Sequence, residues 1–552
     1  MSNSGPVWGL WDRIAEPRRR GSSLHCWAGG HYDTTPWVKV VTDSERTTAG
    51  LRRLGVEPGA RVAAVLTNDA LAVRGLLGVW LAGGALASLP TPARGMDAAE
   101  YFGHLRTICQ QLDPVAVLVD GQILGAIPEA LQAGFRFHSW DSVIDSGRIS
   151  PEPPDDHEVA FIQYSSGSTG APKGCMLTPR AIAAQIDILT SMIAARPSHE
   201  VVATWTPLSH DMGLFGSLLL TLTNDMEYFM STPQRFIGAP ASWFADIAQC
   251  GATASAGTST SLYLAARATA RSTAIAHDGL TTLRNCIIGA ERVDWQTVAY
   301  AQASLGKLGL RPEAMMPAYG LAEATLAVSA VPCTERPRRL ALDAAALAAG
   351  EFKEAAPDDP EASSIVSAGP PCSGVTLPTM TEDTVSEVTV RTPSLARGYW
   401  ADPVATQQKF RDGSVRSGDL GIVHQGELYP IGRVDDVISI AGRKVHAQEV
   451  EQAVERLDGL RPGCSTLIAS GTGRTQRMSL LIEPRTAVDD YKDLADAAAA
   501  TAMAKAAIPV DECVILERGS LPKTPSGKVQ RHRCRSLYEA GKLVPLAIIR
   551  FP

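Results

Sequence analysis

Short aliphatic runs alternate with longer amphipathic stretches through the first 330 residues of the chain. Each run has Gly, Asp or Pro near its edges, and the clearest are RVAAVL (61–66), AVLV (116–119), VAFIQY (159–164) and NCIIGA (285–290). Continuous apolar runs of this length are typical of strands buried on both faces of a largely parallel sheet. Because helical patterns lie between the runs, the alternation predicts an α/β fold.

The clearest helical pattern is RAIAAQIDILTSMIAA (180–195). Its aliphatic residues recur with the spacing of one helical face: Ile182, Ile186, Leu189 and Ile193. Thr178 and Pro179 precede this face, and these residue types favour the N-cap and the first turn of a helix. The pattern therefore predicts a helix that begins directly after Thr178.

The character of the sequence changes near residue 331. The segment CTERPRRLALDAAALAAGEFKEAAPDDPEASS is rich in Ala, Pro and charge, which is typical of an insertion or a long surface connection. Beyond it, SEVTVRT (386–392) and GIVHQGELYPIG (421–432) indicate antiparallel strands joined at Gly turns. From about residue 433 a helix, two strands and an Ala-rich helix near 490–507 predict a small α+β unit. We expect the domain hinge near Gly432–Arg433.

The longest apolar run is LAVRGLLGVWLAGGALASLP (71–90). Arg74, four glycines and Pro90 interrupt it, so we expect a buried helix of the α/β core and no membrane insertion. The first 20 residues lack a continuous apolar segment after a basic start, so no signal peptide is expected.

Composition limits the classes of function. With 552 residues, 45% of them apolar, the chain is long enough for several hydrophobic cores. A formal charge of −7 gives no reason to expect binding to nucleic acid or to an anionic membrane. The ten cysteines form no CxxC pair and no Cys/His cluster, which argues against a zinc site or a disulfide framework and favours the cytoplasm.

A hydroxyl-rich stretch, YSSGSTGAPKG (164–174), directly follows one predicted strand. It does not fit the P-loop pattern, because Pro172 precedes Lys173 and Gly174 follows it. Its backbone N–H groups and hydroxyls can still bind phosphate oxygens, and its glycines permit close approach. A disordered Ser/Gly linker is the alternative. The preceding strand favours a triphosphate-binding loop.

This loop resembles that of the acyl-adenylate-forming superfamily, which includes acyl-CoA synthetases, adenylation domains of peptide synthetases, and luciferases. The later motifs follow in the family's order: TPLSHDMGL (206–214), IIGAERV (287–293), AYGLAEAT (318–325), RGYW (397–400), SGDLG (417–421), GRVDDVISIAGRKV (432–445) and LPKTPSGKVQR (521–531). Together they cover the chain from about residue 159 to its end. HDMGL, AYGLAEATLAVS and the segment RRLALDAAALAAGEFKEAAP are most similar to the fatty acyl-AMP ligases, which carry an insertion at the last position.

The resemblance implies an α/β fold with a large N-terminal domain (1–432) and a small mobile α+β C-terminal domain (433–552). The large domain is expected to contain two αβαβα-type subdomains, a distorted β-barrel and an insertion at about 333–362. The small domain is expected to rotate at a hinge near Asp435.

The implied activity uses ATP and Mg²⁺ to join a carboxylic acid, expected to be fatty, to AMP with release of pyrophosphate. The acyl group is then expected to pass to the phosphopantetheine thiol of a holo acyl carrier protein. Such a step belongs to lipid or to polyketide and nonribosomal peptide biosynthesis.

The motifs also imply site residues. Lys528 is expected to bridge the incoming carboxylate and the α-phosphate, and Glu323 to hold Mg²⁺ with help from Thr169. The residues expected at the carboxylate entrance of the acyl pocket are His210, Asp211, Met212 and Gly213. His210 is also expected to act in catalysis, by gating the site. Residues expected to bind ATP are Ser165, Ser166, Gly167, Ser168, Thr169, Gly170, Lys173, Gly289, Ala290, Glu291, Tyr319, Gly320, Leu321, Ala322, Asp419 and Arg433.

Several of these side chains have a plain structural alternative. Lys528 can be a solvated surface lysine, and Tyr319 can simply pack in the core. Asp419 can cap a turn, and His210 can be a buried histidine with satisfied hydrogen bonds.

Three other functions stay open. An acyl-CoA ligase is disfavoured by the insertion, which can hinder domain rotation. In a stand-alone amino-acid adenylating enzyme, Asp211 would bind the substrate ammonium. A catalytically dead nucleotide-binding regulator is disfavoured by the presence of both Lys173 and Lys528. The acid itself also stays open, because AGTSTSLYL (256–264) lacks the pattern associated with the acyl tunnel of fatty acyl-AMP ligases.

Overall fold

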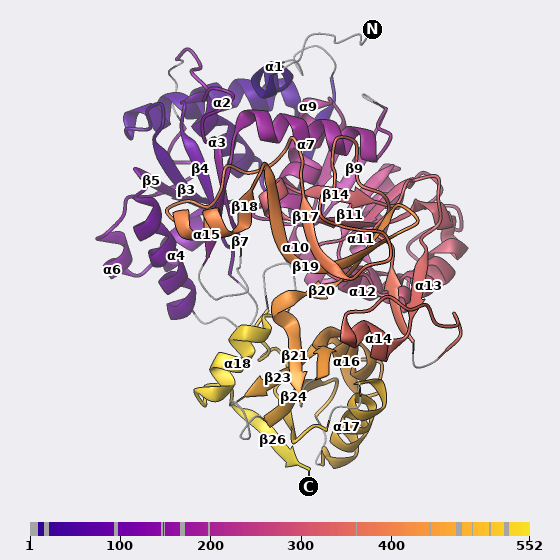
Figure 1. The fold of residues 1–552 in the computed structure, drawn as a ribbon. Coiled ribbons are helices and arrows are strands. Elements are labelled where there is room, and N and C mark those ends of the chain that lie inside the picture. The colour runs from indigo at the N-terminus through magenta and orange to yellow at the C-terminus, as the bar shows by residue number, and fades with distance from the viewer. Residues whose placement is uncertain are drawn as a thin grey trace.

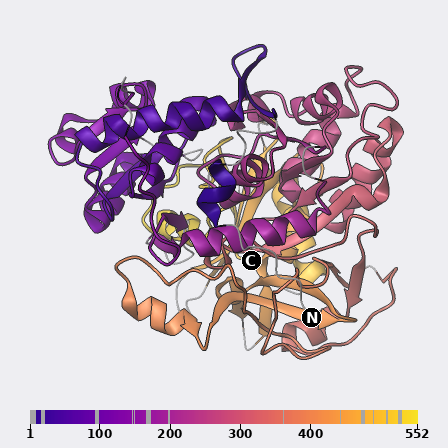
Figure 2. The same ribbon diagram turned by 90° about the horizontal axis from the view of Figure 1, so that it is seen from above.

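The computed structural model describes residues 9–15, 21–92, 98–144, 147, 149–165, 172–196, 199–359, 362–440, 443–470, 477–487, 490–506, 509–523 and 529–551. A large body holds the N-terminal three quarters of the chain, and a smaller body formed by its last part lies below it (Figure 1). Seen from above, two α/β units of the large body lie side by side and an antiparallel unit lies along one edge of both (Figure 2). This is the arrangement of sheets and layers expected from the sequence.

The first α/β unit is built on a six-stranded sheet. The strands, in spatial order, are β6 (Phe137–Ser139), β5 (Ala116–Val119), β3 (Arg61–Val65), β4 (Ala85–Leu89), β7 (Phe161–Ser165) and β8 (Lys173–Leu177). Neighbours are parallel except β7 and β8, which form an antiparallel pair. The helices of this part of the chain are α1 (Leu10–Ala15), α2 (Trp37–Arg53), α3 (Ala70–Leu81), α4 (Ala98–Leu112), α5 (Gly121–Ala126) and α6 (Glu129–Gln132).

The apolar run 71–90 is a helix followed by a strand, so the prediction of one buried helix was wrong over its second half. Asp69 caps α3 by accepting from the backbone of Leu71 and Ala72. The helix ends at Leu81 because Gly83 takes φ +80°, a conformation that favours glycine. A Cβ at Gly83 would also lie 2.8 Å from the carbonyl oxygen of Glu152. The chain then turns back as β4, which is buried in the middle of the sheet.

The second α/β unit is built on an eight-stranded sheet. Its spatial order is β14 (Ala327–Ala330), β13 (Met315–Gly320), β12 (Asn285–Ile288), β11 (Ala254–Gly257), β9 (Val201–Thr204), β10 (Glu227–Met230), β1 (Ser23–Trp27) and β2 (Tyr32–Pro36). Only the terminal pairs β13–β14 and β1–β2 are antiparallel. The helices are α7 (Pro179–Met192), α8 (Asp211–Gly213), η2 (Leu214–Leu219), α9 (Leu220–Thr223), α10 (Pro233–Gly238), α11 (Ser242–Cys250), α12 (Ser259–Thr269) and α13 (Trp295–Leu305), with short turns η3 (Gly306–Leu308), η4 (Pro312–Ala314) and η5 (Ala322–Ala324).

Helix α7 confirms the strongest helical prediction. The Thr178 hydroxyl accepts a hydrogen bond of 3.2 Å from the backbone of Ala181, and Pro179 occupies the first helical position. The predicted aliphatic face is buried, since Ile182, Ile186, Leu189 and Ile193 are each at most 2% exposed. The helix therefore packs through that face, as its amphipathic pattern requires.

The antiparallel unit contains β17 (Ser386–Val390), β18 (Phe410–Arg411), β19 (Ser414–His424) and β20 (Glu427–Arg433), with helix α15 (Pro403–Lys409). The segment expected to be an insertion folds here as β15 (Arg339–Leu342) and β16 (Ser363–Val366), an antiparallel pair, with α14 (Ala344–Ala349) between them. Leu340, Leu342 and Ile365 of this segment pack with Ile422 and Tyr429 of the larger sheet. The insertion is thus part of the folded core of this unit.

The small body begins after β20 with η6 (Val434–Asp436), β21 (Val437–Ile440) and β22 (Arg443–His446). Its main sheet has the order β23 (Leu460–Ser470), β24 (Arg477–Pro484), β25 (Glu512–Leu516) and β26 (Pro545–Arg550). The helices are α16 (Ala447–Val454), α17 (Lys492–Ala506) and α18 (Arg531–Glu539). This is the α+β unit that the sequence predicted.

Membrane spans and cysteines were both considered in the sequence. Among the helices in the described ranges, none has the length and apolarity needed to cross a bilayer. All ten cysteines lie in these ranges, and each is a free thiol.

Candidate active site

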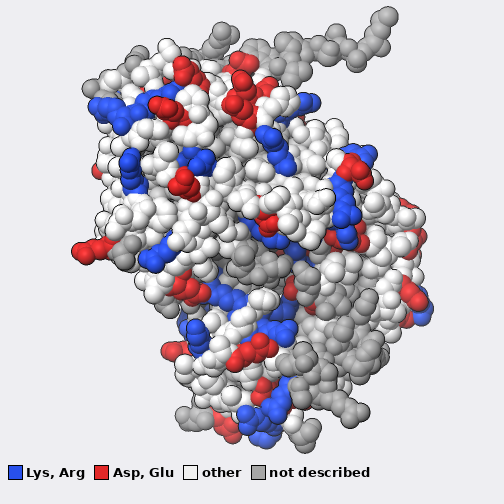
Figure 3. Space-filling model, turned by 60° about the vertical axis from the view of Figure 1, so that its left-hand side comes forward, with Lys and Arg blue, Asp and Glu red and all other residues white. Residues whose placement is uncertain are grey.

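A cavity of about 1760 Å³ extends from the boundary between the two bodies into the second α/β unit. Lysine and arginine side chains gather where the large and small bodies meet (Figure 3). The predicted site residues that line the cavity are Lys173, His210, Asp211, Met212, Gly289, Ala290, Glu291, Tyr319, Gly320, Leu321, Ala322, Glu323, Asp419 and Arg433. Residues from six separate motifs therefore meet at one cavity.

Two predicted loops lie outside the described residues. Ser166, Gly167, Ser168, Thr169 and Gly170 belong to the first, and Lys528 belongs to the second. The ends of both loops are described. Ser165 pairs with Lys173 across β7 and β8, and Lys523 pairs with Val529. Each pairing closes its loop at the base. Asp435 is described only through its backbone, which lies in η6.

A cation, a phenol and a carboxylate follow one another along one wall of the cavity. The Lys173 ammonium lies 5.3 Å from the ring centroid of Tyr399, and the Tyr399 hydroxyl donates a 2.5 Å hydrogen bond to Glu323. Burial, followed by the charge of Glu323, raises the pKa of Tyr399, so the phenol stays protonated and donates. The contact orients the Glu323 carboxylate at the cavity wall.

A second group of side chains joins strand β13 of the second sheet to the antiparallel unit. The Tyr319 hydroxyl donates to Asp419 at 2.7 Å, and Arg433 lies 3.6 Å from the same carboxylate. Burial raises the pKa of Tyr319, with a further contribution from Asp419. Burial alone would lower the pKa of Arg433, but the carboxylates of Asp419 and Asp436 outweigh it. Asp419 therefore does more than cap a turn.

His210 and Asp211 stand at the start of the α8 helix. His210 Nδ1 lies 2.5 Å from Asp211 Oδ1, and the backbone N–H of Met212 donates to both side chains. The His210 side chain is 30% exposed and lines the cavity, so it is not a core histidine. Gly213 is buried, and a Cβ there would lie 2.2 Å from the carbonyl oxygen of Pro207. Gly213 thus permits the close approach of α8 to the preceding segment.

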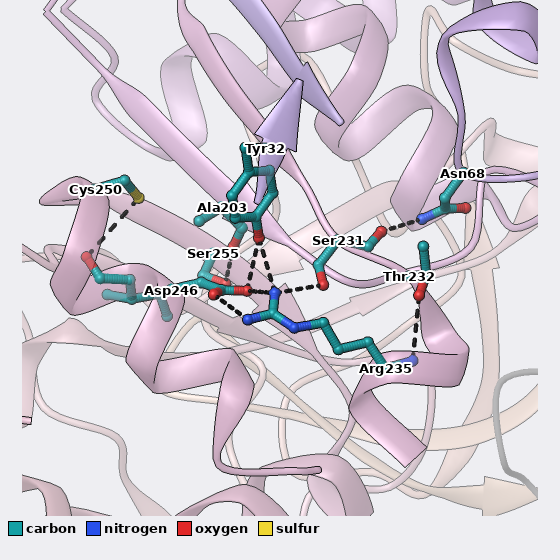
Figure 4. Close-up of polar contacts among 10 residues, drawn as sticks. Tyr32, Asn68, Ala203, Ser231, Thr232, Arg235, Asp246, Cys250 and Ser255 are labelled. Carbon is teal, nitrogen blue, oxygen red and sulfur yellow. Dashed lines mark hydrogen bonds and ion pairs between the residues drawn. The ribbon is translucent and has the colours of Figure 1, made fainter. Parts of the chain in front are cut away.

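The buried Asn68 holds that segment in place. Its Nδ2 donates to the carbonyl oxygens of Thr206 (3.0 Å) and Ser231 (2.8 Å), and its Oδ1 accepts from Leu208 (3.0 Å). Figure 4 shows the Asn68–Ser231 contact beside the ion pair of Arg235 and Asp246, which joins α10 to α11. Asn68 thereby links the first α/β unit to the segment that leads into His210.

The turn after β12 carries Gly289, Ala290 and Glu291. Gly289 is packed so closely that a Cβ would lie 2.9 Å from the carbonyl oxygen of Ala318. Ala290 has φ +64°, an uncommon conformation for a residue with a side chain, and such residues cluster at ligand sites. Glu291 accepts a 2.5 Å hydrogen bond from the backbone of Thr260. These contacts fix the turn at the cavity wall.

The side chains present fit a Mg²⁺-bound nucleoside triphosphate. Glu323 is a hard oxygen donor, which suits Mg²⁺, and the Asp419 carboxylate offers acceptor oxygens for vicinal hydroxyls. Lys173 and Arg433 supply positive charge at the cavity wall, which suits the phosphates.

The two bodies are joined by buried polar contacts beside the cavity. Glu449 of α16 accepts from Arg292 at 3.2 Å and from Ser363 of the insertion strand β16 at 2.8 Å. Burial alone would raise the pKa of Glu449, but the Arg292 guanidinium and the Ser363 hydroxyl outweigh it and lower that pKa. On the opposite side, Arg533 of α18 pairs with Glu100 of α4. The segment expected to be an insertion is therefore in direct contact with the small body.

Three of these residues had no role in the sequence interpretation: Tyr399, Asn68 and Glu449. Tyr399 belongs to the motif RGYW, so its position in an ordered motif was a usable signal. Asn68 and Glu449 lie outside the quoted motifs, and nothing local in the sequence indicates that they join separate units.

The family model described as AMP-binding enzyme matches residues 19–400. Medium-chain-fatty-acid--[acyl-carrier-protein] ligase JamA of Moorena producens is 32% identical, over 70% of this chain and 68% of the relative. Long-chain-fatty-acid--AMP ligase FadD26 of Mycobacterium tuberculosis is 28% identical, over 93% of this chain and 92% of the relative. A solved structure from work on fatty acyl-adenylate ligases of E. coli and L. pneumophila superposes with a TM-score of 0.88 at 23% identity, covering 97% of this chain and 98% of the other. This likeness confirms the predicted fold class.

Proposed function

Because this chain belongs to the AMP-binding enzyme family, we propose that it activates a fatty acid as acyl-AMP and transfers the acyl group to a carrier protein. The family is the one indicated by the sequence motifs. Relatives named as fatty acid–AMP ligases, one of them an acyl-carrier-protein ligase, support this choice.

The observation that carries the proposal is the placement of opposite charges around one cavity. Lys173 and Arg433 offer cations, while Glu323 and Asp419 offer oriented carboxylates, each held by a tyrosine hydroxyl. A reaction between a carboxylate and a triphosphate brings two anions together, so it needs preorganised positive charge and a metal-binding carboxylate. The cavity combines both.

In the proposed reaction, an oxygen of the substrate carboxylate attacks the α-phosphorus of ATP, and pyrophosphate leaves. Asp419 binds the ribose hydroxyls, while Lys173 and the hydroxyl-rich loop 165–170 hold the phosphates. Lys528 neutralises the carboxylate and α-phosphate oxygens as they approach. When bound at Glu323, Mg²⁺ supplies additional charge neutralisation along the phosphates.

The second half of the proposal is transfer of the acyl group to the thiol of a phosphopantetheine arm. The thiol sulfur attacks the acyl carbonyl carbon, the C–O bond to AMP breaks, and AMP leaves. A protein-bound acceptor is favoured over free coenzyme A because Ser363 of the insertion is hydrogen-bonded to the small body through Glu449. That contact opposes the domain rotation which we associate with coenzyme A transfer. We further propose that the enzyme works in the cytoplasm.

An acid-panel assay tests this function. Purified protein, ATP and Mg²⁺ are offered fatty, hydroxy, aryl and amino acids, and pyrophosphate release is measured. The activated product is then offered separately to coenzyme A and to a holo carrier protein. The proposal requires acid-dependent pyrophosphate release with fatty acids and acyl transfer to the carrier. A response limited to amino acids would contradict it, as would nucleotide binding without any turnover.

A further inference from the structure

The inner part of the cavity is an apolar chamber. It lies between the eight-stranded sheet on one side and the helices α7 and η2–α9 on the other. Its lining includes Leu189, Ile193, Val202, Leu220, Ala254 and Ala256. Strand β11 contributes only small residues, with the sequence ASAG. Larger side chains on this central strand would fill the space, so β11 helps to make the chamber possible.

One wall of the chamber is a continuous helical run that starts at the charged end of the cavity. Met212, Gly216, Ser217 and Leu220 line the cavity along this run, beginning beside Asp211. The middle of the run, η2, is a π-helix, a rare form that is frequent at functional sites. Gly216 is the one residue of η2 that is not buried. The π-helical turn therefore opens toward the cavity at a residue without a side chain.

Gly216 lies against Leu326 in the wall of the passage into the chamber. A Cβ at position 216 would lie 3.0 Å from Leu326 Cδ2, and both residues line the cavity. Because the nearest atom is the end of a flexible side chain, Ala can be accommodated there by a small shift. A larger side chain would project into the passage and narrow it.

The hydroxyl groups of the chamber wall already have partners. Thr204 Oγ1 lies 3.0 Å from the Tyr228 hydroxyl, and Ser217 donates to the carbonyl oxygen of Met212 at 3.2 Å. A polar group of a ligand placed against these residues would lose its hydration without gaining a free partner from them, which is costly. The chamber therefore suits a plain hydrocarbon tail.

The helical run also gives the depth of the chamber. Met212 and Leu220 are separated by eight residues, which at 1.5 Å per residue gives at most about 12 Å. Leu220 packs in one buried cluster with Leu189 and Ile193, which closes the far end. An extended hydrocarbon chain lengthens by roughly 1.2 Å per bond, since three bonds span about 3.5 Å. The chamber therefore holds a tail of about ten bonds.

We propose that this chamber selects unsubstituted acids of medium length, about eight to twelve carbons, and that Gly216 is a specificity-determining residue. This inference rests on the proposed function. Gly216 admits the hydrocarbon tail, and Leu220 with Ile193 limits its length.

Acid-dependent pyrophosphate release across straight-chain acids from butanoic to octadecanoic acid, with 3-hydroxydecanoic acid included, tests this inference. The wild type is expected to be most active near decanoic acid and at least tenfold less active with hexadecanoic and 3-hydroxydecanoic acids. Gly216→Leu is expected to lower kcat/KM for decanoic acid at least tenfold relative to butanoic acid, because each methylene is worth roughly tenfold or more. Leu220→Ala is expected to move the optimum to longer acids.

Tyr300→Phe is the matched control, since Tyr300 lines the same cavity from α13, outside the chamber. Its chain-length profile is expected to equal that of the wild type. If Gly216→Leu does not fold by its thermal melt, Gly216→Ala and Leu220→Ala decide the question. A wild type that prefers octadecanoic or hydroxy acids would overturn the inference, as would identical profiles in all variants, while the proposed function would stand. A wild type that activates no acid would overturn both.

Discussion

The hydroxyl of Tyr399 donates a 2.5 Å hydrogen bond to the carboxylate of Glu323, although the two residues are 76 positions apart in the chain. Lys173 lies over the ring of the same tyrosine. One phenol thus contacts both the Lys173 cation and the Glu323 carboxylate, which in the proposed reaction hold the phosphates and the metal. Tyr399 acts through Glu323, which makes it a positioning residue.

Replacing Tyr399 by Phe tests this relationship. The variant keeps the ring and loses the hydrogen bond to a charged acceptor, which is worth about 1.5–3 kcal/mol. We expect kcat for pyrophosphate release to fall roughly 10- to 100-fold, with KM for the acid nearly unchanged and with a higher Mg²⁺ concentration needed for half-maximal rate. Tyr429→Phe is the control, because Tyr429 is a buried tyrosine near Glu427 in the antiparallel unit. An unchanged Mg²⁺ requirement in Tyr399→Phe would show that Tyr399 does not position Glu323 for the metal.

The role of Lys528 is tested by Lys528→Ala. A contact that strengthens as the carboxylate and the α-phosphate meet stabilises the transition state more than bound ATP, so its loss lowers kcat first. We expect adenylate formation to fall below detection, while ATP affinity by calorimetry stays within a few fold. Lys542→Ala, an exposed lysine of the same body, should behave like the wild type. Normal pyrophosphate exchange in Lys528→Ala would exclude this lysine from the mechanism.

Asp419→Asn tests the ribose contact. The substitution keeps the shape and removes the charge that strengthens hydrogen bonds from hydroxyl donors. We expect KM for ATP to rise about tenfold, and we expect 2′-deoxy-ATP to lose its disadvantage relative to ATP in the variant. If the variant still discriminates against the deoxynucleotide as the wild type does, Asp419 does not contact the ribose.

The contact of Glu449 with Arg292 and Ser363 is expected to control the acceptor. Glu449→Gln weakens the link between the insertion and the small body, so we expect a higher ratio of acyl-CoA to acyl-carrier product, about tenfold, and faster tryptic cleavage near Asp435. Glu351→Gln, an exposed glutamate of the insertion, is the control. Equal product ratios in the two variants would show that this contact does not restrict coenzyme A.

The pairing of Glu449 is also expected to make the stability of the fold depend on pH. The pKa of Glu449 is lowered in the folded protein, so its pairing contributes stability above the pKa of a free glutamate and is lost as the pH falls through the lowered value. Thermal melts from pH 7 down to pH 3 should therefore show a steeper loss of stability in the wild type than in Glu449→Gln. Parallel curves would contradict the assignment.

The sequence predicted the parts of the fold that depend on local pattern. Helix α7 begins where Thr178 and Pro179 indicate, and the strand β5 occupies Ala116–Val119 as its aliphatic run predicts. The run 71–90 was interpreted wrongly because its composition is uniformly apolar, while the switch from helix to strand depends on one backbone angle at Gly83. Periodicity carries no information on such a switch.

The candidate site was predictable to the extent that its residues lie in ordered motifs. The residues that join separate units were not, because Asn68 and Glu449 act through contacts between segments distant in the chain. The same holds for Gly216, because its role depends on its position on a π-helical turn that packs against Leu326. Those relations arise only when the chain is folded.

A crystal structure of the protein with a non-hydrolysable decanoyl-adenylate analogue tests the central claim most directly. The account predicts that the ribose hydroxyls lie within about 3 Å of the Asp419 carboxylate, with the phosphate substitute beside residues 165–173. It also predicts that the hydrocarbon tail runs past Gly216 and Leu326 into the chamber. An analogue bound outside this cavity, or with its phosphate substitute away from residues 165–173, would contradict the account.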